Sequence, residues 1–331
     1  CSAARNSGAG LAIGGTFYLH EGEIEVQAKI VDVRESAPLY AVPASIASRD
    51  NISEALDQVV QRTVGVVATH RTAHAHFQLM SHAPVFEAYR EFVAGSDLFA
   101  VDSTASIHHL ERAVELDPSF TSAHFRLAVA YRNAGRRAEA VEVLNRVEER
   151  RPLLTDFERL WLDYFVASLE RRRRDGLALL RRIEDIVPDD PVVQHLIGST
   201  AFRLNRPREV LAATSAMIEG RGFEFFVHNP LAAGSFLRCA LSYHFLGKHE
   251  EELRTARAGL EIFPTDHNLL VAEARALIAL GDEMSFEKAV AEILSTPTGL
   301  TPANLLVEAA ATARAHGRPD RARNLARRAL T

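Results

Sequence analysis

Hydrophobic residues recur with two different periods along this chain, and the change of period divides it into two regions. From Ile24 to Ile30 apolar residues alternate with Glu, Gln and Lys, and period two predicts a strand with one buried face. Beyond about residue 84 the apolar residues recur every three to four positions, which predicts one amphipathic helix after another. A sheet-containing region therefore precedes a long helical one.

The first 70 residues predict a small α/β domain. Pro43 cannot donate to a ladder, so the strand that contains it should lie at a sheet edge. Three strands and one helix make a thin sheet, and we expect upstream parts of this domain to be missing. Residue 1 is Cys, so a fragment of a longer chain and a lipoprotein that starts at its mature Cys1 both stay open. The expected elements are strands at 11–19, 24–30 and 39–46, a turn at 20–23 and a helix at 52–68.

A helix-pair motif recurs through the rest of the chain. The string Leu127-Ala128-x2-Tyr131-x3-Gly135 returns at 197–205, at 239–247 and, more weakly, at 273–281 and 309–317. A small residue lets two antiparallel helices approach closely, and Gly or Asn takes the left-handed conformation that ends the first helix. A proline then stops each second helix. These prolines are Pro118, Pro152, Pro188 and Pro264.

This spacing resembles the tetratricopeptide repeat over about residues 84–330. The resemblance implies a mainly α fold, a solenoid of about six to seven helix pairs preceded by a small, incomplete three-stranded α/β domain. The expected division is 1–70 for the α/β domain, 71–83 for a linker or helix end, and 84–331 for the solenoid.

The beginning of the chain also resembles the last part of a domain similar to the amino-terminal domain of TolB. The residues that carry this resemblance are 11–19, 27–32 and the helix at 52–68. In bacteria that domain commonly precedes tetratricopeptide repeats and follows a serine/threonine kinase or adenylate cyclase. The resemblance implies a regulatory or sensory, signalling region. The chain itself lacks a Gly-rich loop with its lysine and the HRD and DFG strings, so kinase activity would lie outside it.

In this architecture the first helices of successive pairs line a concave groove, and a partner protein or peptide would bind there. Mixed aromatic, arginine and histidine content suits such a surface. By helical spacing the groove residues are Phe125, Val129, Arg132 and Asn133, then His195, Ser199, Phe202 and Arg203, then Leu237, Leu241, His244 and Phe245.

Composition narrows the remaining functions. The formal charge of −5 argues against nucleic acid as a partner, and apolar runs are too short to insert in a membrane. Cys1 and Cys239 make no disulfide framework, and Cys239 in an apolar run predicts a buried, inert thiol. No signal peptide is visible, and bacterial cytoplasm and periplasm or exterior both remain possible.

Candidate chemistry is sparse. His70, His74, His76 and His82 lie close in sequence, but no acidic residue between them could act as a base and no cysteine cluster accompanies them. A helix end or interdomain contact fits them better than a metal. Asp189-Asp190 predicts a turn and a helix cap. The sequence therefore predicts no catalytic residue, no metal, no cofactor and no enzyme.

Two arginine-rich stretches bear on the partner. Arg171 to Arg174 are expected at the carboxy end of a helix, where positive charge suits the dipole. The arginines of 314–328 form a basic face for an acidic partner or another copy, or a simple polar cap. A binding scaffold is the first hypothesis. A subunit that assembles head-to-tail into oligomers or filaments is the alternative, and a small-molecule or metal sensor or an enzyme comes last.

Overall fold

A computed structural model describes residues 9–33, 37–70, 79–188, 190–219, 231–295 and 302–330. The chain divides into two compact units, Cys1–Leu179 and Leu180–Thr331. Within the described residues, no helix combines the length and apolarity that a membrane crossing requires.

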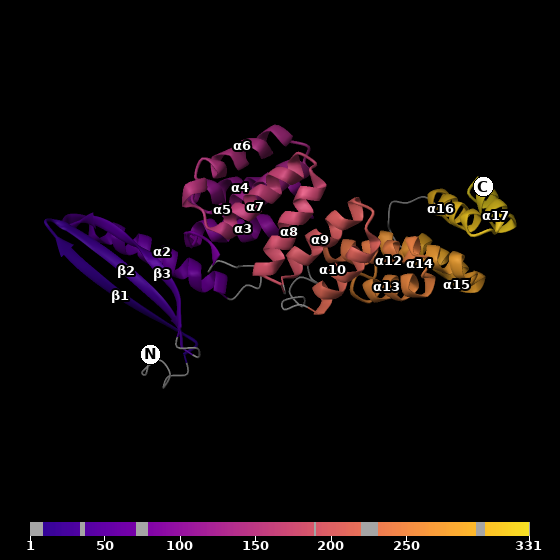
Figure 1. The fold of residues 1–331 in the computed structure, drawn as a ribbon, viewed down its shortest axis with the longest axis horizontal. Helices are drawn as coiled ribbons and strands as arrows, with labels where there is room; N and C mark the ends of the chain where they lie inside the picture. Colours follow the sequence, from indigo (N-terminus) through magenta and orange to yellow (C-terminus); the bar gives the residue numbers. More distant parts are fainter. Residues whose placement is uncertain are drawn as a thin grey trace. The chain divides into compact units, whose positions relative to one another are not determined.

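The first unit opens with an antiparallel sheet in the order β1-β2-β3, formed by β1 (Leu11–His20), β2 (Glu23–Asp32) and β3 (Ala37–Ser48) (Figure 1). The three predicted strands are therefore present. Glu21 and Gly22 both have positive φ, which is the backbone of a tight two-residue hairpin turn between β1 and β2. The 3-10 turn Arg49–Asn51 then leads into α2 (Ile52–His70), which packs on β2 and β3.

Pro43 lies at an irregularity of β3, which is an edge strand as predicted. Val26 pairs with Ser45 but Ala28 pairs with Val42, so β3 has one more residue than β2 between these two pairs. The extra residue is a bulge, and a bulge tolerates a proline that has no N–H to offer. Below it, Ile30 and Val42 pack with α2 in the core of this domain.

Residues 79–85 tie the α/β domain to the helices that follow within the first unit. The Ala83 N–H donates to the Tyr40 hydroxyl at 2.6 Å, and Arg62 donates to the Ala83 carbonyl at 2.8 Å. On the other side, the backbone and hydroxyl of Ser81 both donate to the buried carboxylate of Glu158 at 3.1 Å. The end of the expected linker at 71–83 is therefore held on both sides, while 71–78 lie outside the described residues.

Helix pairs fill the rest of both units, and Figure 1 shows the helices of a pair lying side by side. The described residues contain seven pairs, within the predicted number. The first unit has α3 (Phe86–Asp97) with α4 (Ser103–Leu116), α5 (Thr121–Asn133) with α6 (Arg137–Glu148), the 3-10 turn Arg151–Leu153, and α7 (Asp156–Leu169), which α8 (Arg173–Ile186) follows across the division. The second unit has α9 (Pro191–Arg203) with α10 (Pro207–Glu219), α12 (Leu231–Phe245) with α13 (His249–Ile262), α14 (His267–Leu280) with α15 (Glu283–Ser295), and α16 (Pro302–Ala315) with α17 (Pro319–Arg328).

The predicted left-handed residues end the first helices. Gly135, Gly247, Gly281 and Gly317 have φ between 69° and 82°, and Asn205 has φ 56°. In the pair of α7 and α8 this position is Arg171, with φ 59°. An arginine in this conformation lowers the stability of the fold by about 1 kcal/mol relative to glycine. Because the pair has neither Gly nor Asn at this position, the repeat motif does not reveal it in the sequence.

The structure corrects the placement of the arginine run. Arg171 and Arg172 form the turn after α7, while Arg173 and Arg174 begin α8. The left-handed Arg171 lies in the turn after α7, so the helix ends before the arginine run and not within it. Asp190, by contrast, caps α9 as predicted, because its carboxylate accepts from the N–H groups of Val192 and Val193 at 2.8 Å. Asp189 lies outside the described residues.

We expect Gly65→Ala to destabilise the first unit by about 1–3 kcal/mol. A Cβ at residue 65 would lie far inside contact distance of the Pro84 carbonyl oxygen, a backbone atom that cannot turn away. Gly176→Ala is the matched control: it is also a helical glycine, and its Cβ would meet Tyr164 at an ordinary 3.8 Å. That control should gain up to about 1 kcal/mol from helix propensity. Urea unfolding followed by circular dichroism measures both, and equal gains would refute the close contact.

Candidate functional site

In the first unit the predicted groove residues lie on the face of α5 that meets α7. Arg132 is half-buried, and its Nη1 donates to the Ser168 hydroxyl of α7 at 3.0 Å. Val129 is also half-buried, and Asn133 is exposed. Phe125 is only 5% exposed, because its ring lies 4.9 Å from the ring of Phe165. The expectation that Phe125 faces an open groove is therefore wrong, since α7 closes over it.

The sequence reasoning missed the aromatic residues that α7 adds to this face. Trp161 stacks on Phe165, with ring centroids 5.6 Å apart and an interplanar angle of 23°. Both are half-buried, so each ring keeps a solvent-accessible part. Residues 161, 165 and 168 share one helix face by their spacing, and that face contacts α5. The aromatic string at 157–165 carries the signal, but this helix lacks the Gly or Asn that marks the other first helices, and Arg171 takes that position instead.

In the second unit His195 is interior. Its Nδ1 lies 2.7 Å from the Ser235 hydroxyl and 3.1 Å from Nη2 of Arg238, both on α12. The expectation that His195 lines an open groove is wrong, because α12 covers this side of α9. Burial first, and the positive charge of Arg238 second, lower the pKa of His195 to about 3. In a neutral imidazole Nδ1 can accept the hydrogen bond that Nη2 of Arg238 donates.

Of the other predicted residues of α9 and α12, the structure brings two aromatic rings together. The rings of Phe202 and Phe245 stack with centroids 6.2 Å apart, and Phe245 is 60% exposed. Arg203 is exposed beside Phe202. Ser199, Leu237 and Leu241 are half-buried and complete the set. We call Phe202, Arg203, Leu241 and Phe245 the aromatic face.

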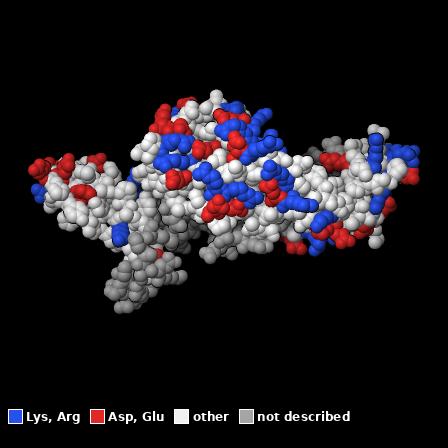
Figure 2. All heavy atoms as spheres, in the orientation of Figure 1, with Lys and Arg blue, Asp and Glu red and all other residues white. Residues whose placement is uncertain are grey.

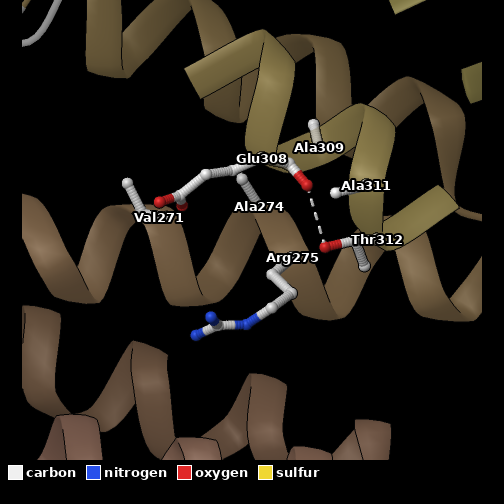
Figure 3. A pocket seen from close by; sticks show the side chains of 7 residues that line it. All are labelled: Val271, Ala274, Arg275, Glu308, Ala309, Ala311 and Thr312. Atoms are coloured by element: carbon white, nitrogen blue, oxygen red, sulfur yellow. Dashed lines mark hydrogen bonds between the residues drawn. The ribbon is translucent and has the colours of Figure 1, made fainter. Parts of the chain in front are cut away.

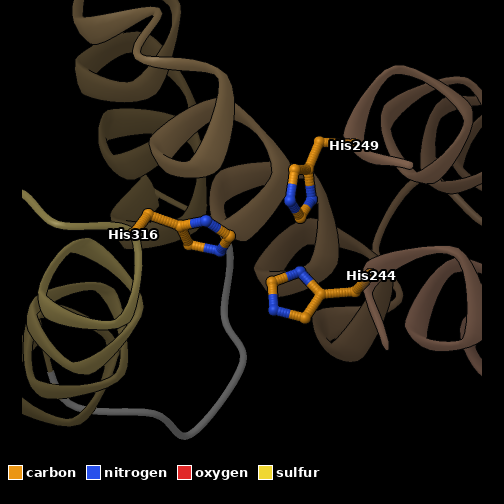
Figure 4. A group of neighbouring side chains, drawn as sticks. All are labelled: His244, His249 and His316. Carbon is orange, nitrogen blue, oxygen red and sulfur yellow. The ribbon is translucent and has the colours of Figure 1, made fainter. Parts of the chain in front are cut away.

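His244 turns away from that face into a group of charged and imidazole side chains. Its Nδ1 lies 2.8 Å from Oε2 of Glu252, and the rings of His249 and His316 stand 5.1 and 5.5 Å from its own (Figure 4). Glu252 is wholly buried, which by itself would raise the pKa of its carboxyl. Hydrogen bonds from His244 and His249 outweigh burial and leave that pKa below its usual value. The sequence reasoning missed this group, because His316 comes from a turn far along the chain from His244 and His249.

A small cavity of about 250 Å³ lies between the first helices α14 and α16. Figure 3 shows the Arg275 and Glu308 side chains at it, and the Thr312 hydroxyl donates to the Glu308 backbone carbonyl at 3.1 Å. The rest of its lining is apolar. Its volume is just below the range of small-molecule pockets, so it suits one side chain of a partner better than a cofactor. The lining residues are Val271, Ala274, Arg275, Glu308, Ala309, Ala311 and Thr312.

The basic tail is partly neutralised inside the second unit. Arg321 and Arg328 of α17 each donate to Glu287 of α15 at 2.7 Å. Elsewhere acidic and basic side chains are interspersed, as Figure 2 shows for one side of the molecule. The tail is expected to be either a basic face for a partner or a polar cap. These contacts favour a polar cap on the last helix pair.

The remaining reactive groups offer little chemistry. Cys239 is buried, and burial raises the pKa of its thiol to about 11, so it stays protonated at neutral pH, as an inert thiol should. Of the early histidines, His82 lies 3.1 Å from the Ser81 hydroxyl through Nδ1. His74 and His76 lie outside the described residues, as does the side chain of His70.

Acid should weaken the fold through His195. Between pH 6.5 and about 3 the unfolded chain binds a proton at this residue that the folded chain does not bind. The free energy of unfolding therefore falls as pH falls, by up to about 1.4 kcal/mol per pH unit. In His195→Asn the amide oxygen can still accept from Arg238 but does not titrate, so the slope between pH 6.5 and 4.5 should decrease.

The measurement is urea unfolding at several pH values in this window. His108→Asn is the control, because His108 is exposed and its replacement should leave the slope unchanged. If His195→Asn keeps the wild-type slope, His195 is not buried in its neutral form.

Comparison with known proteins agrees with the helix pairs. Residues 102–161 match the tetratricopeptide repeat model. No curated protein matches. Among solved structures, the chain is similar to TTC0263, a thermophilic tetratricopeptide repeat protein of Thermus thermophilus, with 20% identity, a TM-score of 0.45 and coverage of 58% of this chain and 99% of that one.

Two further structures are similar at lower identity. A tetratricopeptide repeat protein of Parabacteroides merdae has 14% identity and a TM-score of 0.43, covering 74% of this chain and 92% of that one. YrrB, described as a tetratricopeptide repeat protein with an unusual peptide-binding site, has 18% identity and a TM-score of 0.35, covering 56% and 91%. None of these three scores reaches 0.5, so the assignment rests on the matched residues and the recurring pairs. Residues 102–161 are therefore similar to tetratricopeptide repeats, and they lie in a series of helix pairs that follows a three-stranded sheet in the chain.

Proposed function

We propose that this chain is a protein-interaction scaffold, without catalytic activity of its own, that binds a peptide segment of a partner protein on the aromatic face. The observation that carries the proposal is Phe245, whose ring is 60% exposed although it stacks on Phe202. A large aromatic ring held in place by a neighbour and left in water is available for burial by a ligand.

The surroundings of Phe245 indicate the chemistry of the ligand. Leu241 is half-buried on the same helix, and Arg203 is exposed next to Phe202. Aromatic residues and arginine are the residue types that contribute most to binding at protein interfaces. The face therefore suits a segment that combines an apolar side chain with a carboxylate.

The first unit offers a second surface of the same kind. Arg132 of α5 contacts Ser168 of α7, and on the same two helices Phe125 contacts Phe165, which stacks on Trp161. Because Arg132 is already held by Ser168, its guanidinium is oriented before any ligand arrives, which lowers the entropic cost of binding. We propose that this surface also contacts the partner. The beginning of the chain resembles a domain that in bacteria often follows a kinase or a cyclase. We therefore propose a regulatory role in bacterial signalling.

Peptides selected from a random displayed library on the wild-type chain provide the probe. We expect the double variant Arg203→Ala with Phe245→Ala to bind a selected peptide at least about 10-fold more weakly, because it loses both the apolar and the charged contact. Fluorescence anisotropy with the labelled peptide gives the Kd. Met284→Ala is the matched control, an 84% exposed side chain on the second helix α15. Unchanged affinity in the double variant would place the binding surface elsewhere.

Self-assembly is the second candidate, and the exposed strand β1 favours it. Among the described residues β1 is paired only with β2, and its Ile13, Phe17 and Leu19 are 58%, 66% and 50% exposed. By the strand register Phe17 lies opposite the buried Val26, so these side chains are on the face that α2 covers further along the sheet. Within the described part of the chain, the sheet therefore presents an apolar surface with nothing packed on it there.

Helix α2 extends this apolar surface. Its Leu56, Val60 and Val64 are 39–52% exposed and share one side of the helix. Gln58, on the opposite side, accepts from Ser45 of β3, so the exposed side is directed toward β1. Charged residues and prolines usually prevent an edge strand from pairing with another chain. From Leu11 to Leu19 β1 has neither. Two copies joined antiparallel through β1 would bury this surface with the same residues from each.

Light scattering across a concentration series tests this second candidate. We expect the wild-type chain to dimerise with rising concentration and Phe17→Lys to remain monomeric, because a lysine on the edge strand would be buried without a partner. Met284→Lys, which places the same charge on α15, should leave the dimer intact. A wild-type chain that stays monomeric throughout would remove β1 pairing from consideration.

A further inference from the structure

Three imidazoles from two separate turns meet in the second unit. His244 is near the end of α12, His249 begins α13 and His316 follows α16 (Figure 4). One ring nitrogen of each lies within 4.8 Å of the corresponding nitrogens of the other two. All three side chains are half-buried, so they are sheltered but still reachable from solvent. Neutral imidazole is the commonest side chain that binds metals in proteins.

A buried carboxylate orients two of these rings. Oε2 of Glu252 lies 2.8 Å from Nδ1 of His244 and 3.0 Å from Nδ1 of His249, and Glu252 has no exposed side-chain surface. A carboxylate accepts hydrogen bonds, so each Nδ1 carries the proton and each Nε2 keeps its lone pair. This carboxylate–histidine arrangement fixes the tautomer and orientation of histidines that hold metals.

The charge of Glu252 is already balanced without protonating a histidine. Nε of Arg275, on α14, donates to Oε1 of Glu252 at 3.2 Å. The arginine therefore supplies the positive charge that a buried carboxylate needs. A metal ion requires neutral imidazoles, and because Arg275 pairs with Glu252, the countercharge of this carboxylate does not have to come from a histidine.

We propose that His244, His249 and His316 bind one divalent transition metal ion of the zinc class, with Glu252 as a positioning residue. Three nitrogen ligands suit Zn²⁺, Co²⁺ or Ni²⁺ rather than Ca²⁺ or Mg²⁺, which prefer oxygen. A tetrahedral site with metal–nitrogen distances of about 2.1 Å places its ligands about 3.4 Å apart, which is compatible with ring nitrogens that all lie within 4.8 Å of one another. Three protein ligands leave the fourth position to water or to a side chain of a partner.

The bound ion would join turns that are distant in sequence. His244 and His249 flank the turn between α12 and α13, and His316 lies in the turn between α16 and α17. The pair α14 and α15 lies between them in the sequence, and its Arg275 also lines the cavity beside α16. The ion would therefore link the last three helix pairs. It would also fix the position of Arg275, which pairs with Glu252 and lines that cavity.

Zinc titration of the untagged full-length chain, after removal of metal with a chelator, tests the site. A chromophoric chelator as competitor reports both stoichiometry and affinity. We expect one equivalent of Zn²⁺ in the wild type, and His316→Ala should bind that equivalent at least about 100-fold more weakly because it loses one of three ligands. Glu252→Gln should weaken binding by about 10–100-fold, the usual effect of losing such a positioning carboxylate. Zn²⁺ should also raise the Tm of the wild type but not of His316→Ala.

His267→Ala is the matched control, because it removes a histidine of the same unit that lies outside the group. It should bind zinc like the wild type. His316 follows the end of a helix, so its replacement should leave the fold intact, and circular dichroism checks this. If His316→Ala does not fold, the same titration with His316→Gln decides.

Two results would overturn the site. The first is a wild-type chain that takes up no zinc. The second is equal uptake and affinity in the wild type and His316→Ala, which would assign the ion to other histidines, such as those between residues 70 and 82. A Co²⁺ adduct of the wild type with visible absorption typical of a tetrahedral ion, lost in His316→Ala, would support the three-histidine ligand set directly.

Discussion

The close approach of two antiparallel helices is the constraint on which the rest of this structure depends. At Gly95 an added Cβ would lie 2.8 Å from Leu110 of the paired helix, and at Gly259 it would lie 2.8 Å from Leu269 of the next pair. Small residues at these points let large ones interdigitate around them. A single pair cannot bury its apolar side alone, so each pair depends on the next for its stability.

The same close packing explains where the ionisable groups lie. Glu158 and Glu252 are both buried, and each accepts hydrogen bonds from at least one residue outside its own helix. Glu158 holds residue 81 against α7, while Glu252 orients two histidines with the help of Arg275. A buried carboxylate without such partners would cost several kcal/mol, so these donors fix the geometry of the turns that carry them. The first carboxylate anchors a connection, and the second prepares the proposed metal site.

The proposed binding functions depend on the apolar side chains that this packing leaves exposed. The stack covers Phe125 and His195 but leaves Phe245 exposed, and α2 covers β2 and β3 but leaves Phe17 exposed. These two exposed surfaces differ in kind. The aromatic face combines rings with an arginine and suits a peptide, whereas the surface of β1 is an apolar strand edge and suits another strand.

The sequence by itself determined the local features of this protein. Alternation from Ile24 to Ile30 gave a strand, and Gly135, Asn205 and Gly247 ended helices where the motif placed them, because both depend on residues close in the chain. Only the tertiary structure decided which helix faces stay open and which histidines meet. His244 and His316 belong to different pairs, and the burial of Phe125 depends on a ring of α7. Such contacts are set by how successive pairs stack, and a periodic pattern within one helix does not contain that information.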